Sequence, residues 1–407
     1  MQPAVQVMRC LTLKTCGFSV CNLKLQNITR YGVKMIKIVS VFGTRPEAIK
    51  MAPVLLEFEK HKKQIDSKIV VTAQHRQMLD QVMDLFELKP DIDMNIMKQN
   101  QTLFDITNKT MLGMEEILRK LKPDIVLVQG DTTSAFASAL AAFYEKIAVG
   151  HVEAGLRTDD IYNPFPEEAN RRFISVVTTL HFPPTKWAAK NLTSRAITKN
   201  VYVTGNTVTD ALFYILKKDK KRKIKLIDDI KKRKNRIIFV ETHRRENLGK
   251  PMRDVCMALK KLIKEFKDVE IVFSVHKNPK VREVVFPVLE NVERVHLLEP
   301  MDYQDLVKYM SASYLILTDS GGIQEEAPSL GVPVLVLRTT TERPEGVECG
   351  VARLAGTDTE KVFKLTSNLL KNKKAYDKMS KAVNPYGDGK AAKRIVNIIL
   401  NHFKNQK

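Results

Sequence analysis

Several polar runs in this 407-residue sequence follow directly after apolar segments, and they contain the residue types that acid–base chemistry requires. The most prominent carboxylates are Asp131 in GDTTS, Glu153 in HVEAGLR and Glu167 in PFPEEANRR. Grouped carboxylates separate one another's pKa values, which allows one to act as an acid and another as a base. Each also has a structural interpretation. Asp131 is placed as a helix N-cap, Glu153 can pair with Arg157, and acidic residues are usual in a first helical turn.

Glycine turns and cations follow other apolar segments. In GTRPEAIK (43–50) a glycine turn opens a helix beside two cations, and in TDSGGIQEE (318–326) a serine hydroxyl and two glycine amides form a cradle for an anion. Glu326 is placed to accept hydrogen bonds from a ribose diol, and histidines at two further strand ends fit phosphate binding or acid–base work. The residues predicted for these tasks are Arg45, Lys50, Ser320, Gly321, Gly322 and Arg343, with His243 and His276 as the histidines.

The elements that position these residues alternate short apolar segments with amphipathic ones, which is typical of parallel α/β units. The predicted strands are 36–41, 68–73, 124–128, 147–151 and 201–203 in a first series, and 237–240, 270–275, 295–297, 314–317 and 332–337 in a second. A run with twelve Lys/Arg and three Asp, residues 217–236, separates the two series. Ligands of open parallel sheets lie beyond the carboxyl ends of the strands, so two facing sheets would surround one cleft with the polar runs.

Composition excludes several classes of protein. Hydrophobic residues make up 44% and charged residues 28%, as in globular proteins, and no apolar run approaches the roughly 20 residues that span a bilayer. The net charge of +21 is compatible with a nucleic-acid partner, but RRM, KH and zinc-finger patterns are missing and basicity equally suits an anionic small substrate. Five cysteines without a CxxC pair argue against a disulfide scaffold or a zinc ribbon, so a reducing, cytoplasmic compartment is the default expectation.

Residues 1–34 differ from the rest of the chain. They contain five Lys/Arg, no acidic residue and three of the cysteines. Lys14 interrupts the best candidate for the apolar stretch of a signal peptide. We interpret residues 1–34 as an extension that is disordered or not part of the native domain. Elsewhere the motifs GxGxxG, GxxxxGK[ST], HExxH and GxSxG are missing, so the sequence predicts no nicotinamide cofactor and no metal.

Taken together, the motifs resemble those of the non-hydrolysing UDP-N-acetylglucosamine 2-epimerases. The resemblance extends from Met35 to the C-terminal end of the sequence. The runs that carry it are FGTRPEAIKMAP (42–53), TAQHRQMLDQV (72–82), GDTTS (130–134), GHVEAGLRT (150–158), PEEANRR (166–172), TGNTVTDAL (204–212), HRREN (243–247), TDSGGIQEEAPSLGVPVLVLR (318–338), TTERPEG (340–346) and NPYGDG (384–389).

The resemblance implies an α/β, glycosyltransferase-B-like fold of two Rossmann-like domains with the active site in the interdomain cleft. On this basis the first domain is predicted at 35–208 and a UDP-binding domain at 209–385. A C-terminal helix, 386–407, is expected to cross back and join the first domain. A homodimer is the expected assembly, without a nucleic-acid or membrane partner.

The reaction implied is the interconversion of UDP-GlcNAc and UDP-ManNAc by a cytoplasmic isomerase, for surface polysaccharide or glycan synthesis. The C2 hydrogen is not acidic, so elimination of UDP to a glycal and readdition is favoured over direct deprotonation. The resemblance puts Asp131, Glu153 and Glu167 near the sugar and His243 near the diphosphate. It makes the nucleotide-sugar contacts Arg45, Lys50, His276, Ser320, Gly321, Gly322, Glu326 and Arg343. The nearest alternative is a UDP-sugar-dependent glycosyltransferase of the same fold.

Some bacterial relatives are activated by their own substrate at a second site. Gln74, His75 and Gln77 match the pattern of that allosteric site. Asn100 stands where those regulated enzymes are expected to carry an arginine, which argues against the regulation.

Overall fold

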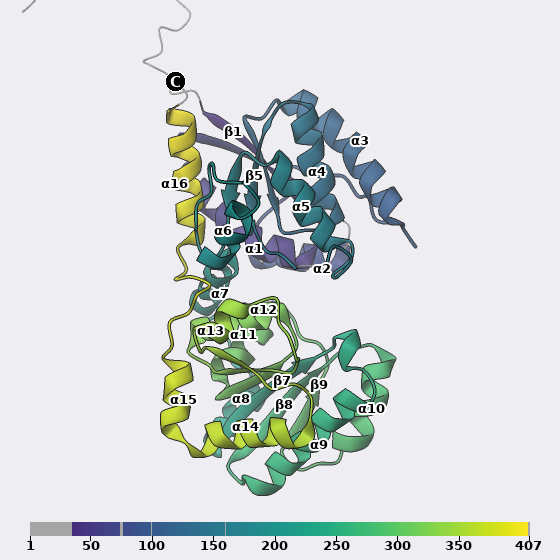
Figure 1. Ribbon diagram of the computed structural model, residues 1–407, viewed down its shortest axis with the longest axis vertical. Helices are drawn as coiled ribbons and strands as arrows, with labels where there is room; N and C mark the ends of the chain where they lie inside the picture. Colours follow the sequence, from purple (N-terminus) through teal and green to yellow (C-terminus); the bar gives the residue numbers. More distant parts are fainter. Residues whose placement is uncertain (1–34, 74–75, 99, 159, 406–407) are drawn as a thin grey trace, which may run out of the picture. The chain divides into compact units, whose positions relative to one another are not determined.

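Two parallel six-stranded sheets form the framework of the computed structural model, which describes residues 35–73, 76–98, 100–158 and 160–405 (Figure 1). The first sheet has the order β3-β2-β1-β4-β5-β6 and the second β12-β11-β10-β7-β8-β9, which is the same Rossmann arrangement twice. The strands are β1 Ile36–Phe42, β2 Ile65–Val71, β3 Ile92–Asp93, β4 Ile125–Gln129, β5 Ala148–Val152, β6 Leu180–Phe182, β7 Arg236–Thr242, β8 Val269–Val275, β9 Val295–Leu298, β10 Leu315–Thr318, β11 Val334–Val336 and β12 Ala352–Leu354.

Helices connect most successive strands, as parallel pairing requires. In the first half they are α1 Arg45–Glu59, α2 Arg76–Leu85, α3 Leu103–Leu121, α4 Thr133–Tyr144, α5 Glu167–Val177, α6 Lys186–Thr193 and α7 Thr207–Lys218. The later ones are α8 Lys225–Lys232, α9 Lys250–Glu265, α10 Pro279–Leu289, α11 Tyr303–Ala312, α12 Gly321–Glu326, α13 Pro344–Glu348, α14 Thr359–Lys371, α15 Lys373–Ser380 and α16 Ala391–Lys404.

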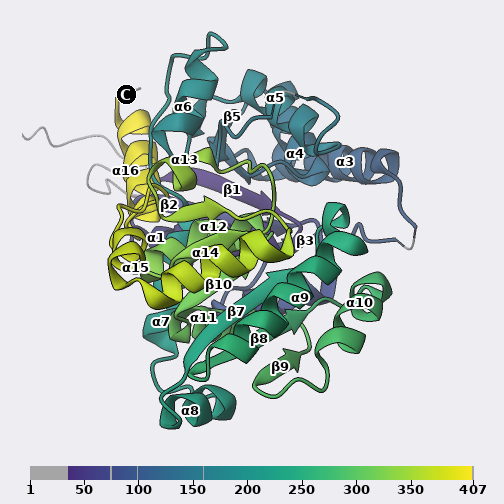
Figure 2. The same ribbon diagram turned by 60° about the horizontal axis from the view of Figure 1, so that its bottom comes forward.

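The central strands are apolar because helices cover both faces of a parallel sheet. Every residue of β4, with the sequence IVLVQ, is buried, and so is every residue of β8. Figure 2 shows β7, β8 and β9 side by side in the second sheet. The predicted pair of α/β series is therefore confirmed.

The prediction of a strand at 201–203 is wrong. Val201 makes only an isolated bridge to His181, and the strand at that edge of the first sheet is β6. The three residues of β6 are Leu180, His181 and Phe182, all buried. A histidine in the middle of so short an apolar run hides the strand in the sequence. The short strands β3 and β12 were also missed, because two or three residues carry little periodicity.

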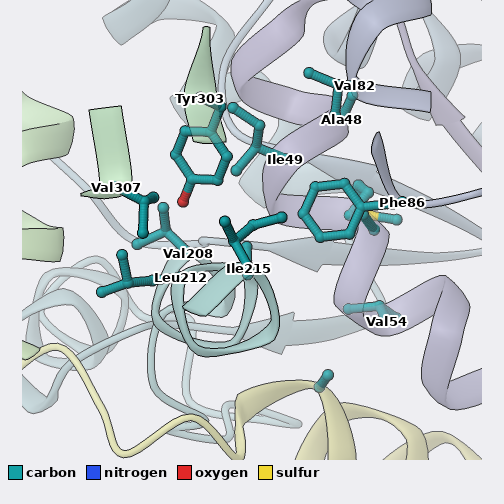
Figure 3. Close-up of a cluster of buried hydrophobic side chains, with 14 of the residues drawn as sticks. Ala48, Ile49, Val54, Val82, Phe86, Val208, Leu212, Ile215, Tyr303 and Val307 are labelled. Carbon is teal, nitrogen blue, oxygen red and sulfur yellow. The ribbon is translucent and has the colours of Figure 1, made fainter. Parts of the chain in front are cut away.

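Helix α7 joins the two halves through one shared hydrophobic cluster. Val208, Leu212 and Ile215 of α7 are buried with Ile49 of α1 and Val307 of α11 (Figure 3). At about 25 cal/mol per Å² of apolar surface removed from water, such side chains contribute roughly 1.5–3 kcal/mol each. The same helix thus contacts helices of both halves, and its N-cap residue Asn206 donates hydrogen bonds to Glu153 of the first half and Glu325 of the second.

Helix α16 packs against the first half of the chain although it follows the second in sequence (Figure 1). Its buried residues include Ile395 and Ile399, which belong to the same cluster as α1 and α7. The carboxylate of Asp210 on α7 accepts hydrogen bonds from the backbone N–H groups of Ala391 and Ala392, 3.1 and 3.0 Å away, and caps the helix. The predicted domain limits at 208 and 385 stay a prediction.

The predicted extension, residues 1–34, lies outside the described residues. Within the parts of the chain that are described, no helix combines the length and the apolar character needed to cross a membrane.

Candidate active site

The polar residues singled out in the sequence lie directly after the carboxyl ends of strands. Gly130 and Asp131 follow β4, Glu153 follows β5, and His243 follows β7. His276 comes directly after β8, and Ser320 comes two residues after β10. Because carboxyl ends of parallel strands share one edge of a sheet, each half presents its polar residues together.

The first turn is shaped by Glu47, a buried carboxylate of α1. It accepts hydrogen bonds from the N–H groups of Gly43 and Thr44, at 3.1 and 2.8 Å, and from the hydroxyl of Thr132 at 2.7 Å. Burial raises the pKa of Glu47, although these hydrogen bonds oppose the effect. This carboxylate therefore locks the turn that leads to Arg45 and Lys50, and it is a structural rather than a reacting group.

Glu153 is the most strongly held of the three candidate carboxylates. It is buried and has a φ of 66°, a conformation that is uncommon for a residue other than glycine. Its oxygens accept hydrogen bonds from Lys50 Nζ and from Gln129 Nε2, and a third from Asn206 Nδ2 at 3.2 Å. Backbone strain of this kind persists only where the surroundings over-determine it, and it is concentrated at functional sites.

The predicted pairing of Glu153 with Arg157 is wrong. The Arg157 guanidinium donates instead to the Ser175 hydroxyl at 2.6 Å and to the carbonyl of Leu156. Lys50 is the cation beside Glu153, and its Nζ also lies 3.5 Å from Glu325 Oε2 of the second half. The two carboxylates raise the pKa of this buried lysine and outweigh desolvation.

Asp131 differs from its predicted role as an N-cap. The residue that caps α4 is Thr132, whose hydroxyl accepts from the N–H of Ala135 at 3.0 Å. The Asp131 carboxylate is bound instead by Arg171 of α5, at 2.8 Å from Nε and 2.7 Å from the terminal nitrogen. An ion pair with two contacts outcompetes a single cap bond, which a neighbouring threonine supplies equally well.

Glu167 begins α5, as the sequence predicted. Its Oε2 atom is buried and has no hydrogen-bond partner among the described residues. Helix α5 also carries Arg171 and Asn170, whose amide donates to the Asp131 carbonyl at 2.9 Å. The beginning of α5 is thereby tied to the loop that carries Asp131, which brings two of the three carboxylates to adjoining segments.

In the second half, Asp319 organises the loop that carries His243. Its fully buried carboxylate accepts from the Thr242 hydroxyl at 2.5 Å, from the N–H groups of His243 and Arg244, and from Asn247 Nδ2. The ring of His243 stacks on that of His276, with centroids 5.4 Å apart. The pKa of His243 is raised by the Glu241 carboxylate, while burial and His243 lower the pKa of His276.

The Ser320–Gly321–Gly322 turn opens α12 and lies beside Arg343. A Cβ on Gly321 would stand 3.2 Å from Arg343 Cζ, so glycine allows the guanidinium to lie over this turn. Arg343 Nε donates to Glu325 Oε1 at 2.8 Å. The adjacent Glu326 is buried with an unpartnered Oε2, and burial raises its pKa to about 8.

Lys50, Glu153, Asn206, Glu325 and Arg343 thus form one buried polar cluster with members from both halves of the chain. Among the described residues, no group of three or more His, Cys, Asp or Glu side chains is arranged to hold a metal ion. Of the predicted allosteric residues, Gln74 and His75 lie outside the described residues, as does the side chain of Gln77. Asn100 is exposed, with a φ of 56°.

Sequence reasoning missed several residues of this cluster and its surroundings. In the sequence, Asn206 has the pattern of an ordinary N-cap, and the neighbouring Glu326 was chosen as the candidate instead of Glu325. Gln129 lies inside the apolar pattern of β4, and Asp319 reads as part of a turn. Gln129 and Asp319 could have been found from the sequence, because an uncharged amide or a carboxylate within or directly beside a buried strand needs a hydrogen-bond partner.

The fold and the buried polar cluster define a two-domain α/β protein of the glycosyltransferase-B-like type, as predicted. A glycosyltransferase from Rickettsia africae shares this fold alone, with a TM-score of 0.61 and 14% identity over 91% of this chain and 100% of that chain. The family model described as UDP-N-acetylglucosamine 2-epimerase matches residues 57–400. The chain belongs to this family, and it is an isomerase.

Two relatives illustrate the similarity. The UDP-N-acetylglucosamine 2-epimerase of Bacillus subtilis is 52% identical over 376 residues, which cover 92% of this chain and 98% of the relative. The crystal structure of the Neisseria meningitidis enzyme bound to UDP-GlcNAc is 48% identical and has a TM-score of 0.82, covering 90% of this chain and 100% of that chain. The similarity predicted from the motifs is therefore confirmed along most of the sequence.

Proposed function

We propose that this protein interconverts UDP-GlcNAc and UDP-ManNAc without a second substrate. The observation that carries the proposal is the buried cluster around Glu153, in which a carboxylate on the first half is linked to Glu325 and Arg343 on the second. Support also comes from the Neisseria meningitidis relative, which binds UDP-GlcNAc. Surface polysaccharide or glycan synthesis is the process that we expect to use the product.

The chemistry that we propose is elimination followed by readdition. A carboxylate removes the C2 proton while the bond from C1 to the UDP oxygen breaks, which leaves a glycal and bound UDP. UDP then adds back to C1, and a proton is delivered to the opposite face of C2, so that no atom is gained or lost. Asp131, Glu153 and Glu167 are the candidates for these proton transfers.

The departing UDP must be held until it adds back, because its escape would end the reaction as hydrolysis. In the proposal His243 stabilises the diphosphate, since Glu241 favours its charged form. The other contacts that we propose for the nucleotide sugar are Arg45, Lys50, His276, Ser320, Gly321, Gly322, Glu326 and Arg343. Arg343 and Lys50 carry carboxylate partners in the ligand-free chain, and phosphate oxygens can replace those partners.

The first experiment adds UDP-GlcNAc alone and follows the anomeric proton signals by NMR. The expected result is an equilibrium between two nucleotide sugars. Turnover only after addition of an acceptor would identify a glycosyltransferase, and accumulation of free ManNAc with UDP would identify a hydrolysing enzyme. Either result contradicts the proposal.

Replacing Glu153 by Gln tests its role in proton transfer. The substitution E153Q keeps the size of the side chain but removes its charge and one acceptor oxygen, while the residues proposed to contact UDP remain, so UDP binding should stay almost unchanged. Incorporation of solvent deuterium at C2 should be abolished, as seen by NMR of the recovered nucleotide sugar in D₂O. Retained exchange at C2 would remove Glu153 from this step.

We also propose that the protein is a homodimer that associates through an apolar patch on α3, α4 and α5, three helices that lie side by side (Figures 1 and 2). In addition to Phe104 near the start of α3, which is 87% exposed, five large apolar residues of these helices are more than half exposed and make up the patch. They are Leu112 (60%), Phe143 (53%), Tyr144 (65%), Phe173 (53%) and Val176 (79%).

A further inference from the structure

Asn206 occupies a buried position between the two halves of the chain, only 2% exposed. One hydrogen of its amide Nδ2 is donated to Glu153 Oε1 at 3.2 Å, and the other to Glu325 Oε2 at 3.1 Å. Its Oδ1 accepts from the N–H of Val208 at 3.0 Å and caps α7. The opposite amide orientation would direct Oδ1 at two carboxylates, so the partners leave only one orientation.

The backbone of Asn206 is held as tightly as its side chain. Its N–H donates to the carbonyl of Tyr386 at 2.6 Å, in the segment that returns from the second half towards α16. Next to it, Gly205 (φ 90°) and Gly387 (φ 131°) come so close that a Cβ on either would lie within 3.4 Å of the other's Cα. The outgoing and returning connections between the halves therefore meet at Asn206.

The buried carboxylates of Glu153 and Glu325 lie close together with few cations beside them. Lys50 lies between Glu153 and Glu325, whereas Arg343 pairs with Glu325 and with Glu342 but forms no ion pair with Glu153 among the described residues. Asn206 supplies the other donor that is common to both carboxylates, and it does so without adding charge. Without that amide, the Glu153 carboxylate loses one of its three side-chain hydrogen bonds, and only Lys50 and Gln129 remain to orient it.

We propose that Asn206 is a positioning residue, which orients the Glu153 carboxylate and links its placement to the double connection between the halves. The inference rests on the proposed epimerisation, in which Glu153 acts on the C2 proton. Asn206 itself acts through Glu153. Removal of its amide should therefore reduce kcat while the affinity for UDP is preserved.

The test compares two serine substitutions at helix N-caps. N206S keeps a hydroxyl that can cap α7 but is too short to reach both carboxylates. N372S is the matched control, because the Asn372 side chain caps α15 at Ala375 N–H and contacts neither candidate carboxylate. The measurements are kcat by NMR with UDP-GlcNAc, Kd for UDP by calorimetry, and the thermal midpoint of each full-length variant.

For N206S we expect kcat to fall about 10- to 100-fold, which corresponds to the loss of a hydrogen bond to a charged group. The Kd for UDP should stay within about threefold of the wild-type value, while the thermal midpoint should fall below that of N372S because two hydrogen bonds to buried carboxylates are lost. N372S should retain wild-type kcat. Unchanged kcat in a folded N206S protein would overturn the proposal, and so would an equal loss of kcat in N372S.

A second variant covers the case in which N206S does not fold. N206D keeps a strong N-cap but places a third carboxylate beside Glu153 and Glu325, so kcat should fall at least as far as expected for N206S. Wild-type kcat in N206D would overturn the proposal. If the wild-type protein itself does not epimerise UDP-GlcNAc, the proposed function fails, and that outcome is recognised before any variant is made.

Discussion

Glu326 shows how one oxygen of a buried carboxylate can be left without a well-aligned hydrogen-bond partner. The Oε2 atom of Glu326 is buried without a well-aligned hydrogen-bond partner among the described residues, although the Tyr303 hydroxyl interacts with this carboxylate and opposes the rise of its pKa. Burial raises the pKa of Glu326 from its ordinary value of 4.5 to about 8. Unsatisfied groups of this kind cost about 1–3 kcal/mol, which is tolerated where a ligand later supplies the partner. The ribose diol proposed for Glu326 would do so.

The raised pKa of Glu326 predicts how its removal changes stability. A carboxyl group whose pKa is raised on folding stabilises the protein fully below about 4.5, and this contribution is lost as pH rises towards 8. The variant E326Q has no such group. The free energy of unfolding of E326Q minus that of the wild type should therefore increase between pH 5 and pH 8, by at most about 1.4 kcal/mol per pH unit.

Urea unfolding of both ligand-free proteins at pH 5, 6.5 and 8 measures this difference. It should stop growing above pH 8. A difference that does not change with pH would mean that Glu326 is ionised throughout.

The sequence revealed residues whose type is itself unusual at its position, and it hid those that depend on distant partners. The sequence could indicate Ser320, Gly321 and Gly322 because a pair of glycines after a strand has few structural explanations other than an anion-binding turn. Asn206 was hidden because an N-cap explains it fully, and only the fold brings Glu153, 53 residues away, to its amide. Likewise, Asp131 was predicted to be an N-cap because the sequence does not show that Arg171 is its partner.

The neighbouring strands β5 and β6 carry two buried histidines opposite each other. His151 pairs in register with His181, and burial lowers the pKa of each from 6.5 to about 4. His151 Nε2 donates to the Gly130 carbonyl at 2.7 Å, which holds the loop leading to Asp131. Both rings are therefore neutral at pH 7, and their protonation opposes folding.

Acid should therefore destabilise the protein through this strand pair. A histidine whose pKa is lowered on folding contributes stability that is present above 6.5 and lost as pH falls through 4. Each histidine adds about 1.4 kcal/mol per pH unit to the slope in this range. The variant H181Q should lower the slope of unfolding free energy against pH by that amount, measured by urea unfolding between pH 6.5 and 4.5. An unchanged slope in H181Q would mean that groups other than His181 cause the acid sensitivity.

Strand prediction succeeded for the inner strands and for the edge strand β9, and it failed for the three short edge strands β3, β6 and β12. Strands such as β4 and β8 are wholly buried and consist mainly of apolar residues. Edge strands β3, β6 and β12 have two or three residues, so pairing rather than pattern defines them. Tertiary contact decides these elements, and a single sequence does not display it.

At the scale of the whole molecule, the exposed patch on α3, α4 and α5 predicts self-association. The variant V176R places a charge at the most exposed residue of the patch, and we expect it to convert a dimer to a monomer. V383R is the control, because Val383 is 80% exposed and lies outside the patch, so this variant should remain dimeric. Sedimentation velocity gives the masses. A monomeric wild type, or equal behaviour of the two variants, would contradict the proposed dimer.

The return of α16 to the first half determines when that half can be completed during synthesis. The groove that Ile395 and Ile399 fill is bounded by helices made from residues 45–59 and 207–218, which leave the ribosome well before α16. At about 5–20 residues per second, the groove stays open while the second sheet is translated. Nascent chains therefore expose an apolar surface for many seconds, until residues 391–404 are synthesised and cover it.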